Sequence, residues 1–153
     1  MKLHRSTPNG KRRAWHLCCI GLLLSGTALA EDSRQLVSLP PPAQEALRQE
    51  MRNNLVAINE ILTLVTAGKL PEAGEVAEQH LGLSAQGKHR DKPFDARPGP
   101  HMPPAMHALG MDGHRAASEF AKVAKSGERE RTQGLLPTLT GTCVACHFAY
   151  RIR

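Results

Sequence analysis

The chain has 153 residues, of which 41% are hydrophobic, 22% charged and only 3% aromatic, and its formal net charge is +6. This length favours a single domain, and the hydrophobic fraction is too high for a disordered chain. The positive charge suggests nucleic-acid binding, but its distribution along the chain argues against that interpretation.

The first thirty residues have the pattern of an export signal. Basic residues without any acidic residue precede an apolar run over residues 14–24, and the small residues that follow form an A-x-A cleavage site. We expect cleavage after Ala30 and a periplasmic mature protein of residues 31–153. A membrane anchor is the weaker alternative, because the run is shorter than the roughly 20 residues that a span needs. Cys18 and Cys19 lie in this run and would be removed with it.

Removal of this leader changes the charge and the cysteine content. Five of the 20 basic residues and none of the 14 acidic ones lie in it, so the remaining chain has a net charge of 15 − 14 = +1. No concentrated basic surface remains, which excludes nucleic acid as a partner, and no membrane association is expected after cleavage. The remaining cysteines, Cys143 and Cys146, are so close in sequence that a disulfide between them would stabilise the fold little.

From residue 41 onward the hydrophobic pattern is helical. A first helix is expected up to Gly68, a typical C-terminal residue. Its apolar stripe has the helical period and consists of Leu47, Met51, Leu55, Ile58, Leu62 and Val65. A second, shorter helix is expected from Pro71 to about Leu81, followed by a proline-rich loop over residues 84–104.

Two further helices complete the chain. The third is expected over residues 105–125, with one face formed by His114, Ala117, Phe120 or Ala121, and Ala124. The fourth is expected over residues 128–151, kinked or split by Pro137 and Gly141. No segment has the alternating pattern of a strand. The sequence therefore predicts an all-α fold, an antiparallel four-helix bundle, whose thin aromatic content leaves room for something other than side chains in its core.

The segment Cys143-Val144-Ala145-Cys146-His147 is a C-x-x-C-H motif, the attachment signature of c-type haem. On a helix these three positions share one face, so both thiols can reach the two vinyl groups at one haem edge. His147 would then be the proximal ligand of the iron. The alternatives are a zinc site, which usually needs two spaced ligand pairs, a redox dithiol, which needs a βαβ context, and a disulfide. One covalently attached haem c is favoured over all three.

A C-x-x-C-H motif in the last helix, followed by the pair Tyr150-Arg151, resembles the class II c-type cytochromes, the cytochrome c′ family. The resemblance extends over the mature chain through the segments LRQEM, AGKLPEA and RAASEF. It implies a left-handed up-down-up-down bundle, and Arg48 matches the family's first-helix arginine. Arg151, expected one helical turn beyond His147, would lie near the imidazole or a haem propionate.

The family offers two designs for the other side of the iron. In one, an apolar residue of the first helix shields a five-coordinate iron that binds gases such as NO or CO. In the other, a methionine is the sixth ligand and the protein is a low-spin electron carrier. Met51 is the candidate here, although counting back from Gly68 places the family's ligand position nearer Arg52. The alternative is that Met51 is an ordinary core methionine.

The third helix carries a second candidate site. His107, Met111 and His114 share a helix face and offer soft ligands for copper(I). The simpler interpretation is that these are ordinary solvated or half-buried side chains.

The sequence thus predicts an exported monohaem electron carrier. It contains no nucleophile with a paired base and no phosphate-binding loop, so we expect no enzymatic activity. The redox partner is unidentified. Members of the family often form homodimers through the first two helices, and for this chain a homodimer stays open.

Overall fold

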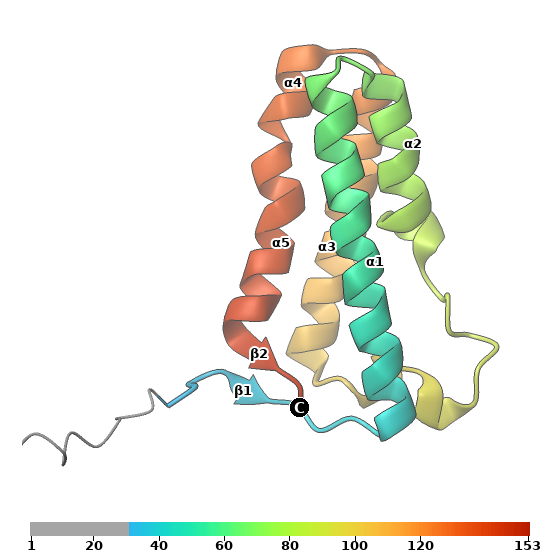
Figure 1. The fold of residues 1–153 in the computed structure, drawn as a ribbon, viewed down its shortest axis with the longest axis vertical. Helices are drawn as coiled ribbons and strands as arrows, with labels where there is room; N and C mark the ends of the chain where they lie inside the picture. Colours follow the sequence, from blue (N-terminus) through green and yellow to red (C-terminus); the bar gives the residue numbers. More distant parts are fainter. Residues whose placement is uncertain (1–30) are drawn as a thin grey trace, which may run out of the picture. The chain divides into compact units, whose positions relative to one another are not determined.

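A computed structural model describes residues 31–153 of the chain. The expected leader, residues 1–30, lies outside the described residues, and its cleavage stays a prediction. The regular elements are, in chain order, β1 (Gln35–Leu36), α1 (Pro41–Thr66), α2 (Leu70–His80), three 3₁₀ turns η2 (Leu83–Ala85), η3 (Phe94–Ala96) and η4 (Gly99–His101), α3 (Pro104–Lys125), α4 (Arg129–Gly134), α5 (Leu136–Ala149) and β2 (Tyr150–Arg151) (Figure 1). The described chain is mostly helical, which confirms the all-α class.

The first two helices have the boundaries that the sequence predicts. α1 begins with prolines at its first two positions, where a missing N–H costs no hydrogen bond. Its end is marked by Gly68, whose φ of +77° lies in the left-handed region that glycine adopts without steric cost. A short turn over residues 67–69 then leads directly into α2, so the two helices pack side by side.

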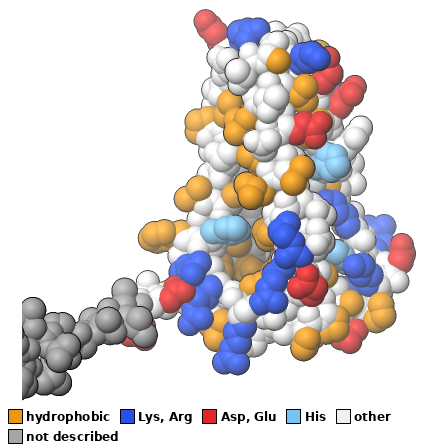
Figure 2. Space-filling model, in the orientation of Figure 1, with side chains coloured by type: hydrophobic (Ala, Val, Ile, Leu, Met, Phe, Trp, Pro, Cys, Tyr) orange, Lys and Arg blue, Asp and Glu red, His pale blue; other side chains and the backbone are white. Residues whose placement is uncertain are grey.

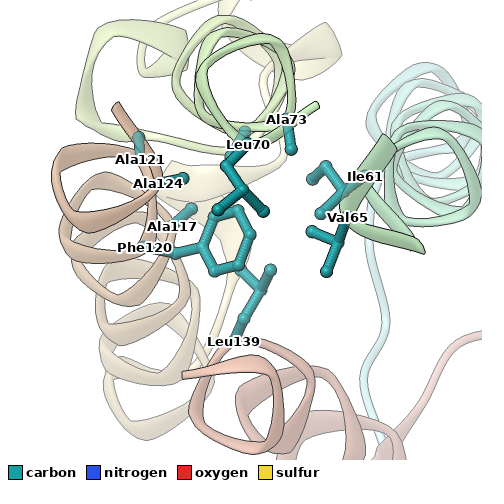
Figure 3. Packing of buried hydrophobic residues seen from close by; sticks show 10 residues of the cluster. Ile61, Val65, Leu70, Ala73, Ala117, Phe120, Ala121, Ala124 and Leu139 are labelled. Atoms are coloured by element: carbon teal, nitrogen blue, oxygen red, sulfur yellow. The ribbon is translucent and has the colours of Figure 1, made fainter. Parts of the chain in front are cut away.

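One hydrophobic cluster, here called the main cluster, joins α1, α2, α3 and α5. Figure 3 shows the ring of Phe120 between Leu70 and Leu139, with Ile61 and Val65 of α1 facing it. Its buried members are Ile61, Val65, Leu70, Ala73, Ala77, Ala117, Phe120, Ala121, Ala124 and Leu139. The predicted inner face of the third helix is therefore confirmed from residue 117 onward.

Helices α2 and α3 approach closely because small residues line their interface. A Cβ atom built on Gly74 would lie 2.8 Å from the carbonyl oxygen of Ala121 and 3.2 Å from the Cβ of Ala124. Close backbone approach replaces bulky side chains here, which explains how a chain with few aromatic residues still closes this part of its core.

A second group, here called the terminal cluster, surrounds the start of α1 and the end of α5. Its buried members are Val37, Leu39, Ala43, Leu47 and Met106, and Met102, Cys146, Tyr150 and Ile152 pack against them. Tyr150, which follows α5, therefore has a packing role. The terminal cluster connects the segment before α1 to the segment after α5.

The expectation that the chain has no strand is wrong in one place. β1 and β2 pair in parallel, with Gln35 opposite Tyr150 and Leu36 opposite Arg151. The N–H of Val37 also donates to the carbonyl oxygen of Arg151 at 2.8 Å. This pair is too short to produce an alternating sequence pattern, and it joins segments from opposite ends of the described chain.

The last predicted helix is split next to Pro137, as the sequence predicts, and Pro137 is the second residue of α5. The break falls at Leu135, between α4 and α5, and Gly141 lies inside α5 without interrupting it. α5 ends at Ala149, and Arg151 belongs to β2. The expectation that Arg151 lies one helical turn beyond His147 is therefore wrong, because strand pairing with β1 extends the backbone from Tyr150 onward.

Candidate functional site

The C-x-x-C-H motif occupies the last turns of α5. Both cysteines are free thiols, Cys143 exposed and Cys146 half-buried, and His147 is exposed. The helical setting assumed for the motif is confirmed, so the two thiols and the imidazole lie on one side of α5. Leu139, one turn before Cys143, is buried in the main cluster, and Cys146 packs against the terminal cluster. Cys143 therefore lies on the inner side of α5, between the two clusters.

The electrostatic setting of Cys146 favours the neutral thiol. Burial raises its pKa above the ordinary value, and the neighbouring Cys143 raises it further. Redox-active and zinc-binding cysteines react as thiolates and usually have lowered pKa values. Cys146 therefore lacks the thiolate-stabilising environment that is typical of a reactive cysteine.

The apolar stripe of α1 is only partly covered. Leu47 and Val65 are buried, as predicted, and Ile58 is half-buried. Met51, Leu55 and Leu62, which also belong to the predicted stripe, are 36%, 71% and 41% exposed. The expectation of a continuous buried stripe is therefore wrong over its middle turns.

The exposed part of the stripe lies on one flank of α1. The opposite flank is covered by the loop after α2, where His89 Nε2 lies 3.3 Å from Glu50 Oε2. α1 packs mainly against α2, and α5 packs mainly against α3. The ribbons of α1 and α5 are accordingly set apart (Figure 1), and on this face hydrophobic side chains and a histidine gather over the region between them (Figure 2).

Met51 and the cysteine motif lie at similar heights along their helices. Leu47 is a member of the terminal cluster and Cys146 packs against it, so these turns of α1 and α5 lie at the same height. Met51 is one turn further along α1, and Cys143 is about one turn earlier on α5. An apolar, partly exposed thioether thus lies at the level of the two thiols, on a flank that protein side chains leave open.

The basic residues proposed for the site have other contacts. Arg52 donates to Glu45 Oε1 and to Gln49 Oε1, each at 2.8 Å, and this holds its guanidinium on the solvent side of α1. The Nη1 atom of Arg48 lies 4.0 Å from Glu45 Oε2, and its side chain is 40% exposed. Arg151 lies in β2, half-buried beside the terminal cluster.

The three residues considered for copper have separate partners. Met111 accepts a hydrogen bond from Gln86 Nε2 at 3.5 Å, and His114 Nδ1 donates to the carbonyl oxygen of Leu81 at 2.7 Å. His107 is exposed and lies beside Gly99. Among the residues that the structure describes, no group of three or more His, Cys, Asp or Glu side chains is placed to hold a metal ion.

Sequence reasoning missed two exposed side chains beside the motif. Val144 is 65% and Phe148 is 83% exposed on the outer side of α5. Their spacing of four residues, one position after Cys143 and one after His147, was the signal that could have identified a second apolar row.

Within residues 31–153, no helix is long and apolar enough to cross a membrane. Comparisons with protein-family models, with curated proteins and with solved structures find no match to this chain.

Proposed function

We propose that this chain is an exported monohaem c-type cytochrome that carries single electrons. The observation that carries the proposal is the juxtaposition of a C-x-x-C-H motif on the inner side of α5 with an apolar but exposed flank on α1. Elsewhere the clusters close with side chains alone. A flat apolar group attached to α5 would cover this flank of α1 and supply the apolar contacts that side chains do not make there.

The residues present fit a haem. Cys143 and Cys146, both free thiols, would hold the group by adding across its two vinyl double bonds, which forms one C–S bond each and transfers the thiol hydrogen to the other vinyl carbon, so that no oxidant is needed. His147 presents an exposed imidazole for the iron on the same side of α5. The iron, when bound, supplies reversible one-electron chemistry, and the protein sets its potential through ligands and burial.

Met51 is the proposed sixth ligand. Its level along α1 and its place on the exposed flank support this role, and a His–Met ligand pair favours ferrous iron. Arg52, the position that the family resemblance favours, is held on the solvent side by Glu45 and Gln49. Arg48 and Arg151 are proposed to lie near the haem, where a propionate would compete with the present partner of Arg48.

The finer fold follows from the same proposal. We infer an antiparallel four-helix bundle of the cytochrome c′ type, in which α1, α2 and α3 are three members and α4 with α5 is the fourth. The short turn between α1 and α2 and the contacts of α2 with α3 and of α3 with α5 support it. The mature protein, residues 31–153, would reach the periplasm after cleavage at Ala30.

One optical experiment tests the ligand set. The haem-loaded protein is expected to give a low-spin ferrous spectrum that CO does not change. Met51→Ala should convert it to a high-spin spectrum that responds to CO, because the sixth position is then open. Met111→Ala is the matched control, since this methionine lies on α3 and contacts Gln86. An unchanged spectrum in Met51→Ala would exclude Met51 as a ligand.

A five-coordinate, gas-binding haem protein is the second candidate. The observation in its favour is Leu55, which lies one turn beyond Met51 on the same flank and is 71% exposed. A leucine here could shield an open iron position. This candidate predicts high-spin ferrous iron and immediate CO binding in the parent protein. Copper binding by His107, Met111 and His114 stays a prediction, and copper retention after replacement of both motif cysteines by serine would support it.

A further inference from the structure

We propose that the outer side of α5 docks a redox partner protein whose own surface is acidic. The docking face consists of Val144 and Phe148 together with Arg34 and Arg153. This inference rests on the proposed electron-carrier function and adds to it the place and the chemistry of the partner.

Two large apolar side chains remain exposed on this face even when the site is filled. Successive residues of a helix are rotated by about 100°, so Val144 and Phe148 point away from the side that carries Cys143 and Cys146. A group attached to those thiols covers the inner side of α5 and leaves the outer side open. Exposures of 65% and 83% for Val144 and Phe148 are then a property of the loaded protein. An exposed apolar pair beside the cofactor marks an interaction surface.

The charge around this pair is positive. From residue 143 to residue 153 the chain contains two arginines, Arg151 and Arg153, and no Asp or Glu. Both arginines follow α5 directly, and strand pairing brings Arg34, the residue before β1, to the same end. Basic side chains accordingly gather beside hydrophobic ones where α5 ends (Figure 2).

These features fit an acidic protein better than the other occupants. A helix that lies on a membrane needs a broad apolar face, whereas α5 offers one row of two side chains and buries its inner side. A symmetric dimer through this face would place its arginines against the same arginines of the second copy. A small apolar contact with complementary charge is typical of transient redox encounters, which bury less than about 1,200 Å².

The test uses the haem-loaded protein in its ferrous state, mixed by stopped flow with an oxidised, acidic single-copper electron-transfer protein. One electron passes from iron to copper(II), and the loss of the ferrous spectrum gives the rate. Arg153→Glu is expected to lower the second-order rate constant by about tenfold at low salt, and by less at high salt, because it weakens electrostatic steering. Phe148→Ser should lower it several-fold at both salt concentrations.

Two controls separate docking from other effects. Val56→Ser, which changes a 67% exposed apolar residue on α1, should leave the rate with the copper protein unchanged. Ferricyanide, which needs no docking surface, should oxidise Phe148→Ser at the parental rate. Equal rates for Phe148→Ser and Val56→Ser with the copper protein would overturn the proposal. So would Phe148-dependent binding to anionic vesicles or Phe148-dependent dimerisation. If the purified chain lacks a haem spectrum before mixing, the proposed function itself has failed.

Discussion

The main cluster and the α1 flank that faces α5 differ in how far their hydrophobic side chains are buried. In the main cluster, Phe120 is fully buried and the small residues of α2 and α3 allow their backbones to touch. On the α1 flank, residues of the same apolar stripe are left exposed, Leu55 to 71%. The same helix, α1, contributes to both. Side chains alone cover the first region, and the second is the one that we propose an additional apolar group covers.

The largest expected effect tests whether the main cluster is independent of that group. Phe120→Ala removes a fully buried ring from the main cluster, which has nine other buried members, and should lower the free energy of unfolding by about 3 to 5 kcal/mol. Denaturant unfolding should give the same loss in haem-free and haem-loaded protein. Phe148→Ala is the matched control, and with an 83% exposed ring it should change stability by less than about 0.5 kcal/mol.

The next effect tests the close approach of α2 and α3. Gly74→Ala places a methyl group 2.8 Å from the carbonyl oxygen of Ala121, so the helices must separate, at a cost of about 1 to 3 kcal/mol. Gly110→Ala, inside α3 with no atom within 4 Å of the new Cβ, should instead stabilise by about 0.5 to 1 kcal/mol. Thermal unfolding of the two variants distinguishes these signs. Equal melting temperatures would contradict the tight packing of this interface.

A smaller but more specific effect concerns the exposed flank. Leu55→Ala should hardly change the stability of the haem-free protein, because Leu55 is mostly exposed there. In the haem-loaded protein the same change should cost about 1 to 2 kcal/mol, because the side chain is then buried. Val56→Ala, on the outer side of the same helix, should have no haem-dependent effect. Equal small losses for Leu55→Ala in both forms would show that nothing covers the flank.

A feature of the fold or the site could be predicted from the sequence where it depends on neighbouring residues, and could not where it depends on contacts between distant segments. The start of α1 follows from its proline pair, and the ends of α1 and α3 follow from the glycines just after them. Gly68 and Gly127 both have the positive φ that glycine adopts without steric cost. The shared face of Cys143 and His147 follows from helical geometry alone. For these features the neighbouring residues determine the backbone.

The remaining features depend on contacts between distant segments. Arg151 is extended because β1, more than a hundred residues earlier, pairs with it. The break at Leu135, by contrast, is local, because Pro137 lies in the first turn of α5, whereas Gly141 continues the helix in a segment that packs against α3. The exposure of Leu55 was not predictable either, because a periodic apolar stripe does not state whether a side chain or a cofactor will cover it.

The smallest effect lies at the far side of the main cluster, where Glu78 connects α2 to α3. Ser118 Oγ donates to Glu78 Oε2 at 2.5 Å, and Ser84 Oγ donates to Oε1 at 2.7 Å. These hydrogen bonds lower the pKa of Glu78 below its ordinary value of 4.5. The carboxylate therefore stabilises the folded state fully above pH 4.5, and this contribution is lost as the pH falls through the lowered folded-state pKa.

Glu78→Gln should cost about 1 kcal/mol at neutral pH and much less in acid. Glu75→Gln is the matched control, since Glu75 lies one turn earlier on the exposed side of α2. Urea unfolding at several pH values measures the difference. A Glu78→Gln cost that persists undiminished in acid would contradict the assignment of this hydrogen-bonded carboxylate.

The most direct test of the whole account is the intact mass of the chain after expression in a host that matures c-type cytochromes. The account predicts residues 31–153 plus one haem, retained under denaturing conditions, and replacement of both motif cysteines by serine should abolish the addition. A colourless product with the mass of the bare processed polypeptide would contradict it.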